Sequence, residues 1–482
     1  MSEDFSVVGL LRRSVTSSVY NAVANIFQVV VLFGRSIALA RLLDPHVFGV
    51  YAFAASVVTL TRPLATLGLG GALLYRTPKG REEEARRVHF TLTALLGAAW
   101  MTLLMVGATF FAPSDTRAAF WVVAGAAYAT LLTQTPRVVL TKRVWFRRLA
   151  FLQAVTAVAS TVVAVGMAWY GFGLWSLLAT DVVAAGLALL VFYGIRPVWR
   201  PRLGWFPAIV RDFLRFGSRV FAGGVLVQAL DRIDDIWTGI VLGSTALGFY
   251  SRAYRFANYP RILLAKPLNQ VATGTYAQVK DDRKRLSKAF FRVNAFIVRV
   301  NFLLAGLLAL VAPEFIRIAL GARWLPMLDA FRLMLVYTLL DPIKITVANV
   351  ITASGAPERV VRARAIQLGV LLAGLVALGP VWGIGGVALA VDLMLVVGMV
   401  VLFWEARRFV DFSPWRLFAA PTLALVVGMV GAQAAILIPG VLGSPWRTGI
   451  VKVSVFLPLF GSLLFVAERE QVLMTVKILR GI

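Results

Sequence analysis

The chain has 482 residues, of which 59% are hydrophobic and only 15% are charged, and its net charge is +26. An ordinary soluble domain carries roughly 25% charged residues, so this composition, with a mean hydropathy of +0.81, excludes a soluble protein and predicts an all-α polytopic membrane protein. The absence of cysteine and the presence of only two histidines exclude disulfides, thiolate metal sites, cysteine nucleophiles and histidine-rich metal sites.

About fourteen apolar segments of spanning length follow one another along the chain, since a helix needs about 20 apolar residues to cross the hydrocarbon core. The first begins after Arg12 and Arg13 and is too long for a signal peptide, so we expect it to remain in the protein. The predicted spans are 16–42, 47–73, 89–112, 117–140, 149–170, 173–195, 217–242, 246–271, 290–312, 327–350, 364–380, 384–404, 417–438 and 446–466.

Basic residues are concentrated in alternate loops between these spans, for example in 76–87, 142–148, 196–215 and 280–288, whereas the intervening loops carry few. Loops rich in Lys and Arg stay in the cytoplasm. The pattern therefore predicts a multi-pass protein of the cell (inner or plasma) membrane with both termini cytoplasmic. It also explains the positive net charge without a nucleic-acid partner.

An internal repeat divides the chain. FGVYAFA at 48–54 matches LGFYSRA at 247–253, and GFGLWSL at 171–177 matches GIGGVAL at 383–389. Spans one to six thus correspond to spans seven to twelve in the same orientation, which predicts two pseudo-symmetric six-helix lobes with a site at their interface. The predicted parts are a first lobe at 1–195, a cytoplasmic basic amphipathic linker lying on anionic headgroups at 196–216, a second lobe at 217–404, and two C-terminal helices with a cytoplasmic tail at 405–482.

The seventh span contains four charges in the run QALDRIDDIW. Its acids, Asp231, Asp234 and Asp235, fit two compatible interpretations: a buried ion pair that locks this span to the next, or titratable carboxylates that bind a coupling proton or sodium ion. In the repeat, Arg35 of the first span is equivalent to Asp234. We therefore expect these two side chains to face each other across a central cavity.

The eighth span, 246–271, carries four basic residues and no carboxylate. On a continuous helix Arg252, Arg255, Tyr259 and Lys266 form one stripe, because they fall at steps of three, four and seven. A charge at the membrane centre costs about 2.5–3.5 kcal/mol on insertion scales, so such residues usually face a bundle interior or a wet cavity. The stripe predicts the cationic wall of a transport cavity for an anion, and guanidinium groups suit a diphosphate because they bind phosphate oxygens bidentately.

Other charged residues lie inside spans as well. Arg62 and Arg299 are further candidates for the cavity wall. For the lone acids Asp181, Asp341 and Asp392 a structural hydrogen-bonding role is favoured over ion coupling. Asp181 and Asp392 are near-equivalent in the repeat.

A family resemblance is carried by IALARLLDPHVFGVYAFA, LGLGGALLYR, DDIWTGIVLGSTALGFYSRAYRFANYP and GIGGVALAV. Through its first twelve spans the chain resembles the polysaccharide flippases of the multidrug/oligosaccharidyl-lipid/polysaccharide (MOP) exporter superfamily, in the colanic-acid-exporter-like branch. The resemblance implies two lobes in a V, alternating access, and an acid at the position of Asp234, whereas Asp231 and Asp235 depart from the family pattern. It implies that the cargo is an oligosaccharide on a polyprenyl diphosphate.

We therefore expect a transporter, not an enzyme, that flips this lipid from the inner to the outer leaflet for cell-surface polysaccharide export. In this hypothesis Arg35, Arg62, Arg252, Arg255 and Lys266 bind the diphosphate. An ion gradient drives the cycle through H⁺ or Na⁺ at the acids of the seventh span, and no other cofactor or metal is expected. The expected partners are the lipid-linked oligosaccharide, membrane lipids and polysaccharide polymerase or assembly proteins, and the chain is expected to be a monomer.

Two other functions remain as alternatives. A cation or drug antiporter of the multidrug and toxin extrusion (MATE) type would favour acids over arginines in its cavity. A membrane-embedded glycan polymerase or ligase would need catalytic side chains in a large outer loop, and no predicted loop is large enough. The chain has no Walker A motif, which disfavours ATP as the energy source.

Overall fold

The structure, a computed structural model, describes residues 7–143, 145–195, 197–262, 266–437 and 444–469; side chains at 7–24, 146, 266–268, 270 and 271 lie outside the description. Within these ranges every regular element is helical, and ten helices are long and apolar enough to cross a membrane. Each of the fourteen predicted segments falls on one helix or on two consecutive helices. The all-α polytopic class is therefore confirmed, while the count of fourteen spans stays a prediction.

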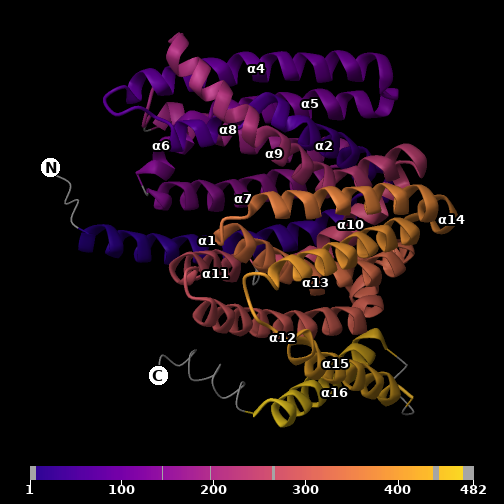
Figure 1. The fold of residues 1–482 in the computed structure, drawn as a ribbon. Helices are drawn as coiled ribbons and strands as arrows, with labels where there is room; N and C mark the ends of the chain where they lie inside the picture. Colours follow the sequence, from indigo (N-terminus) through magenta and orange to yellow (C-terminus); the bar gives the residue numbers. More distant parts are fainter. Residues whose placement is uncertain (1–6, 144, 196, 263–265, 438–443, 470–482) are drawn as a thin grey trace. The chain divides into compact units, whose positions relative to one another are not determined.

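The chain forms two compact units, which we call the N-unit (Met1–Gly248) and the C-unit (Phe249–Ile482). The predicted lobe boundaries differ from this division and stay a prediction. The N-unit contains α1 (Val7–Leu42), α2 (Pro45–Thr66), α3 (Leu69–Tyr75), α4 (Glu82–Phe111), α5 (Ser114–Leu132), α6 (Gln134–Lys142), α7 (Phe146–Trp169), α8 (Leu174–Leu189), η1 (Leu190–Ile195), α9 (Pro207–Val241) and the first turn of α10 (Figure 1).

Helix α2 is the centre of the N-unit. It packs against α4, α5, α8 and α9, while α1 packs on α7. Small residues such as Ala54, Ala119 and Ala124 are fully buried in its core beside the aromatic Trp100 and Phe120. In lipid there is no hydrophobic force between helices, so close approach at small residues and van der Waals contact hold such a bundle together.

Helix α9 includes part of the segment predicted as a surface linker. It begins at Pro207, and Ile209, Val210 and Phe213 are buried in a cluster with side chains of α3 and α4. Arg211, on the same turns, is exposed. The second half of the basic segment is therefore the first part of α9, which packs on protein along its apolar face.

The first turns of α2 and α10 cross at two glycines that the repeat makes equivalent. A Cβ on Gly49 would lie 1.6 Å from the carbonyl oxygen of Ser244, and a Cβ on Gly248 would lie 1.9 Å from that of Pro45. The contact is reciprocal, because Gly49 corresponds to Gly248 and Pro45 to Ser244 in the repeat. Only a residue without a side chain allows this backbone-to-backbone approach.

Replacing Gly49 with alanine is expected to lower the thermal stability of the detergent-solubilised protein. The methyl group would meet backbone rather than a flexible side chain, so the two helices must separate; overpacking typically costs about 1–3 kcal/mol. Gly107→Ala in α4 is the matched control, because no atom lies within 4 Å of its added Cβ. Size-exclusion chromatography after heating measures both variants, and equal stability of the two would contradict the close crossing.

The C-unit contains the rest of α10 (Ser244–Pro260), then α11 (Lys266–Val279), α12 (Arg283–Phe315), η3 (Ile316–Leu320), η4 (Ala322–Met327), α13 (Leu328–Ala353), α14 (Pro357–Ala406), α15 (Pro414–Ala435) and α16 (Pro445–Ala467). α13 packs on α11, α12 and α14, and the α15–α16 pair packs on α12 (Figure 1). Its core combines Phe290, Phe302 and Phe456 with aliphatic side chains.

Helix α14 consists of two antiparallel halves. Its 50 residues would extend about 75 Å as one helix, far beyond the roughly 30 Å of a hydrocarbon core. Gly383 has a φ of 56°, a left-handed conformation that suits glycine and reverses the chain. Gly374 faces Ala390, with only 2.8 Å between an added Cβ and the alanine Cβ, and Gly398 contacts Gln367. The separate eleventh and twelfth spans of the sequence prediction are thus the two halves of α14.

The predicted continuous span 246–271 falls on α10 and α11, and its continuity stays a prediction. Helix α10 ends at Pro260 and α11 begins at Lys266, with Arg261 and Ile262 in a π turn and 263–265 outside the described residues. Arg252, Arg255 and Tyr259 lie on α10, and Lys266 is the first residue of α11.

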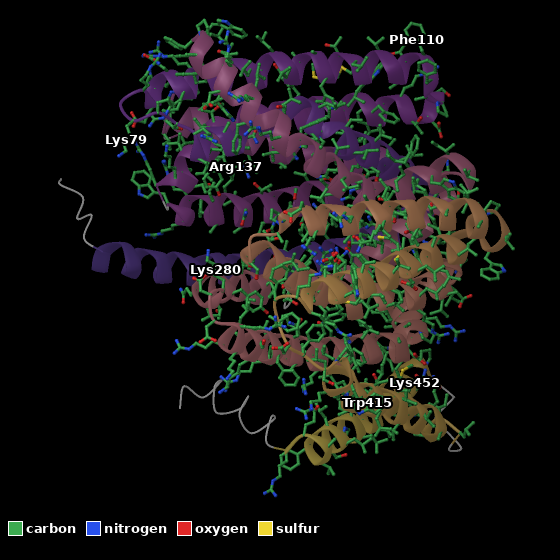
Figure 2. All side chains as sticks on the ribbon, viewed as in Figure 1. Lys79, Phe110, Arg137, Lys280, Trp415 and Lys452 are labelled. Carbon is green, nitrogen blue, oxygen red and sulfur yellow. The ribbon has the colours of Figure 1, made fainter. Side chains whose placement is uncertain are left out.

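A buried ion pair attaches the C-terminal helices to α12. The Lys452 Nζ donates to the Glu314 Oε1 at 2.8 Å and to the Leu310 carbonyl oxygen at 3.1 Å (Lys452 is labelled in Figure 2). Both side chains are at most 11% exposed. Each charge alone would be costly in a low-dielectric interior, so the two side chains stabilise each other there.

Candidate functional site

Basic side chains within the helices fall into two groups, and the difference decides which of them can bind an anion. A cation that is already bonded to a carboxylate has its charge balanced, whereas one without an acidic partner offers an unbalanced charge to a ligand. We therefore sorted the candidates by their contacts within each unit.

In the C-unit the best-defined basic cluster surrounds Asp341, whose side chain is 2% exposed. The Arg261 Nε lies 2.8 Å from one carboxylate oxygen and the Lys344 Nζ lies 2.7 Å from the other. Arg261 also donates to the Tyr337 hydroxyl and stacks over its ring, with its Cζ 5.3 Å from the centroid. The structural role expected of Asp341 fits these contacts, and the two cations are balanced in part by this acid.

The α10 stripe divides in the structure. Arg252 is only 4% exposed and Tyr259 is 9% exposed. Arg255 is exposed and has no hydrogen bond or ion pair with any described residue. The side chain of Lys266 lies outside the described residues. Among the stripe residues whose side chains the structure describes, Arg255 is thus the cation whose charge is available to an anion.

In the N-unit two arginines without an acidic partner lie near each other. Arg62 on α2 is exposed, and its charge acts on Arg137 of α6 (labelled in Figure 2). The Arg137 Cζ sits 5.6 Å from the centre of the Phe192 ring. Neither guanidinium forms an ion pair within the described ranges. Two like charges near each other repel, so this arrangement favours an anion that binds both.

The equivalent positions of the two repeats differ in their surroundings, since Arg62 of the N-unit corresponds to Arg261 of the C-unit. Arg261 has a buried aspartate beside it, and Arg62 has another arginine instead. The same position of the repeat is therefore charge-balanced in the C-unit and unbalanced in the N-unit.

Two other predicted site residues already have protein partners. The Arg35 Nη1 donates to the Ser160 Oγ of α7 at 3.1 Å. The Arg299 Nε donates to Glu468, just after α16, at 2.6 Å, and neither side chain of that pair is more than 11% exposed. Arg299 thus balances an acid of the chain itself, and its proposed contact with a ligand would have to compete with Glu468.

The three acids of α9 have different surroundings. Asp235 is 5% exposed, accepts a hydrogen bond from Ser56 of α2 at 2.8 Å, and pairs with Arg232 at 3.3 Å. Asp234 is also buried, and Asp231 is exposed. The predicted facing of Arg35 and Asp234 stays a prediction. The contacts with Ser56 and Arg232 hold Asp235 between α2 and α9.

Sequence reasoning missed Arg137 and the grouping of Arg261, Asp341 and Lys344. Arg137 follows Pro136 near the end of a predicted span, where a basic residue is easily assigned to the adjacent loop. The spacing of Asp341 and Lys344 by three residues places them on one helix face and signals a pair. No comparable local signal links Arg62 to Arg137.

Comparison with protein-family models finds a match to the polysaccharide biosynthesis protein family over residues 38–329, more than half of the chain. The lipopolysaccharide biosynthesis protein WzxC of Escherichia coli (strain K12) is 21% identical over 424 residues, which cover 85% of this chain and 84% of that protein.

Two solved structures share the fold. The lipid II flippase MurJ in an inward-closed conformation aligns with a TM-score of 0.76 at 13% identity, over 95% of this chain and 100% of that one. An inward-facing multidrug resistance MATE family transporter of the MOP superfamily aligns with a TM-score of 0.56 at 16% identity, over 82% and 94%. At these identities the likeness shows the fold.

Proposed function

The chain belongs to the polysaccharide biosynthesis protein family within the MOP exporter superfamily, a family of membrane flippases, and from this premise we propose that it flips a polyprenyl-diphosphate-linked oligosaccharide. The lipid moves from the inner to the outer leaflet of the cell membrane by alternating access. The observation that carries the proposal is the pair of arginines, Arg62 and Arg137, which have no acidic partner among the described residues.

A diphosphate fits this pair chemically. Each guanidinium presents a planar set of donors that binds phosphate oxygens bidentately and stays charged at any relevant pH. Two phosphates in series offer enough oxygens for both arginines, and their negative charge removes the repulsion between Arg62 and Arg137. Arg255 in the C-unit is the further cation available to the cargo in this proposal, and Arg35, Arg252 and Lys266 complete the predicted set.

Coupling to an ion gradient is proposed for the α9 acids. Ser56 binds Asp235, and Arg62 follows Ser56 by six residues on α2, about 9 Å along the helix. A proton or sodium ion on Asp235 or Asp234 would thus change the charge near the diphosphate site without touching the cargo. Such an ion shifts the equilibrium between two conformations to the extent that it binds one of them more tightly.

The cation antiporter remains the second candidate, because the MATE structure shares the fold. A cationic drug needs carboxylates or aromatic rings where it binds, and Arg62 beside Arg137 is the opposite arrangement. The charge of this site therefore favours an anionic cargo.

Reconstitution distinguishes the two functions. Purified protein in liposomes is expected to move a fluorescent undecaprenyl-diphosphate-linked oligosaccharide between leaflets, which a membrane-impermeant quencher detects, and not to transport ethidium. Imposed proton and sodium gradients, tested separately, identify the coupling ion. Transport of ethidium without lipid flipping would favour the antiporter.

A further inference from the structure

Asp392 lies in the second half of α14 and is 5% exposed. Neither of its carboxylate oxygens accepts a hydrogen bond, and it forms no ion pair with any residue that the structure describes. Its neighbours one turn away on the helix, Ala388 and Leu395, are both fully buried. An ionised carboxylate in such a place costs far more than a neutral one, so the side chain carries a proton.

The near-equivalent acid of the N-unit is different. Asp181 of α8 accepts a hydrogen bond from the Tyr51 hydroxyl at 2.9 Å, as expected for a structural carboxylate. The counterpart of Tyr51 in the repeat is Tyr250, which is fully buried, yet Asp392 receives no hydrogen bond. The structural hydrogen-bonding role expected for both acids therefore applies to Asp181 and is wrong for Asp392.

No charged group on the neighbouring elements balances Asp392. The first half of α14 faces it with the apolar run VLLA at 370–373, as the contact of Gly374 with Ala390 sets the register. On α13, which also packs on α14, Asp341 pairs with Lys344 and Arg261, and Tyr337 accepts from Arg261, while Asp329 and Arg332 lie in the first two turns of that helix. At the end of α14, Glu405 is bonded to Arg359 and Arg408.

We propose that Asp392 is a proton-binding site of the C-unit, protonated in this conformation and ionised only in a conformation that lets water reach α14. The step is a simple dissociation: the carboxylic acid O–H bond breaks, the electron pair stays on the oxygen, and the proton passes to water. Uptake reverses it. Asp235 differs from Asp392, because Arg232 and Ser56 already contact its carboxylate.

The transport consequence rests on the proposed function. If one conformation holds a proton on Asp392 and the other releases it, the ratio of the two changes up to tenfold for each pH unit. A pH difference between the two sides of the membrane can then bias the cycle. Proton binding itself needs no cargo and can be tested without it.

Infrared spectroscopy of the purified protein in lipid nanodiscs tests the site directly. At neutral pH the wild type is expected to show the C=O stretching band of a buried protonated carboxyl group, and Asp392→Asn is expected to lose it. Asp181→Asn is the matched control and keeps that band. Asp392→Leu is a second neutral variant, and both Asp392 variants should melt at or above the wild-type temperature since no paired charge is removed. Identical carboxyl bands in the wild type and in both variants would overturn the proposal.

Flipping of the fluorescent diphosphate-linked oligosaccharide tests the coupling. The wild-type rate is expected to respond to an imposed pH gradient, whereas Asp392→Asn flips at a rate that does not respond. If Asp392→Asn retains the full response, Asp392 does not couple transport to protons. If the infrared band belongs to Asp392 but the wild type flips nothing, the proton site stands and the proposed function fails.

Discussion

Replacement of both Arg62 and Arg137 by alanine is expected to lower the rate of lipid flipping by about 100-fold or more. Hydrogen bonds to charged groups contribute about 1.5–3 kcal/mol each, and every 1.4 kcal/mol is a factor of ten in binding. The loss of two such contacts to the diphosphate is therefore expected to weaken binding by more than 100-fold. The liposome assay with the fluorescent lipid-linked oligosaccharide measures the effect, and each single variant should lie between the double variant and the wild type.

The controls separate binding from folding. Arg211→Ala removes an exposed arginine of α9 in the same unit and is expected to leave flipping unchanged. A double exchange to lysine keeps both charges but not the planar fork, so it should recover part of the activity. Wild-type flipping by the folded double alanine variant would exclude Arg62 and Arg137 from the substrate site.

The second large effect is on stability. Asp341→Ala removes the carboxylate between Arg261 and Lys344 and leaves two cations together beside a buried position. Breaking one partner of a buried ion pair costs about 3–5 kcal/mol, so the melting temperature of the purified protein should fall sharply. Glu84→Ala breaks the exposed pair with Arg81 and should cost about 1 kcal/mol or less.

Replacement of all three charged residues around Asp341 is expected to leave the stability nearly unchanged. A triple variant with Asp341→Leu, Arg261→Met and Lys344→Met leaves no charge without a partner, and such replacements are often neutral in stability. The triple variant should therefore melt close to the wild type. If Asp341→Ala alone is as stable as Glu84→Ala, the cluster around Asp341 does not contribute to the fold.

Hydropathy predicted the helical class because a chain in lipid must satisfy its backbone hydrogen bonds within each segment. It also predicted the reversal inside α14, since Gly383 lies between the spans 364–380 and 384–404, but it did not predict the break inside the span 47–73, where α2 ends at Thr66 and α3 begins at Leu69. That break depends on single residues, because Leu67 and Gly68 both have left-handed φ angles, 37° and 67°. Both residues can be read in the sequence, but their effect depends on the turn that each one meets.

The sequence predicted individual charged residues of the candidate site, but it did not predict which of them contact one another. The sequence identified Arg62, Arg255 and Asp235 as costly charges within membrane segments. Which of them are balanced depends on contacts between helices that lie far apart in the chain, such as that of Asp235 with Ser56. The repeat did not supply this information either, because Asp181 accepts a hydrogen bond from Tyr51, whereas Asp392 accepts none from the part of the chain that the structure describes.

The pair of Glu314 and Lys452 has a consequence for biogenesis. The two residues are 138 positions apart, so at a synthesis rate of about 5–20 residues per second Glu314 leaves the ribosome about 7–28 seconds before its partner. During that interval Glu314 lacks its ion-pair partner, and a lone carboxylate in hydrocarbon is costly. The contact between α12 and α16 can therefore form only after residue 452 has been made, so the stabilisation from this pair arrives late in membrane insertion.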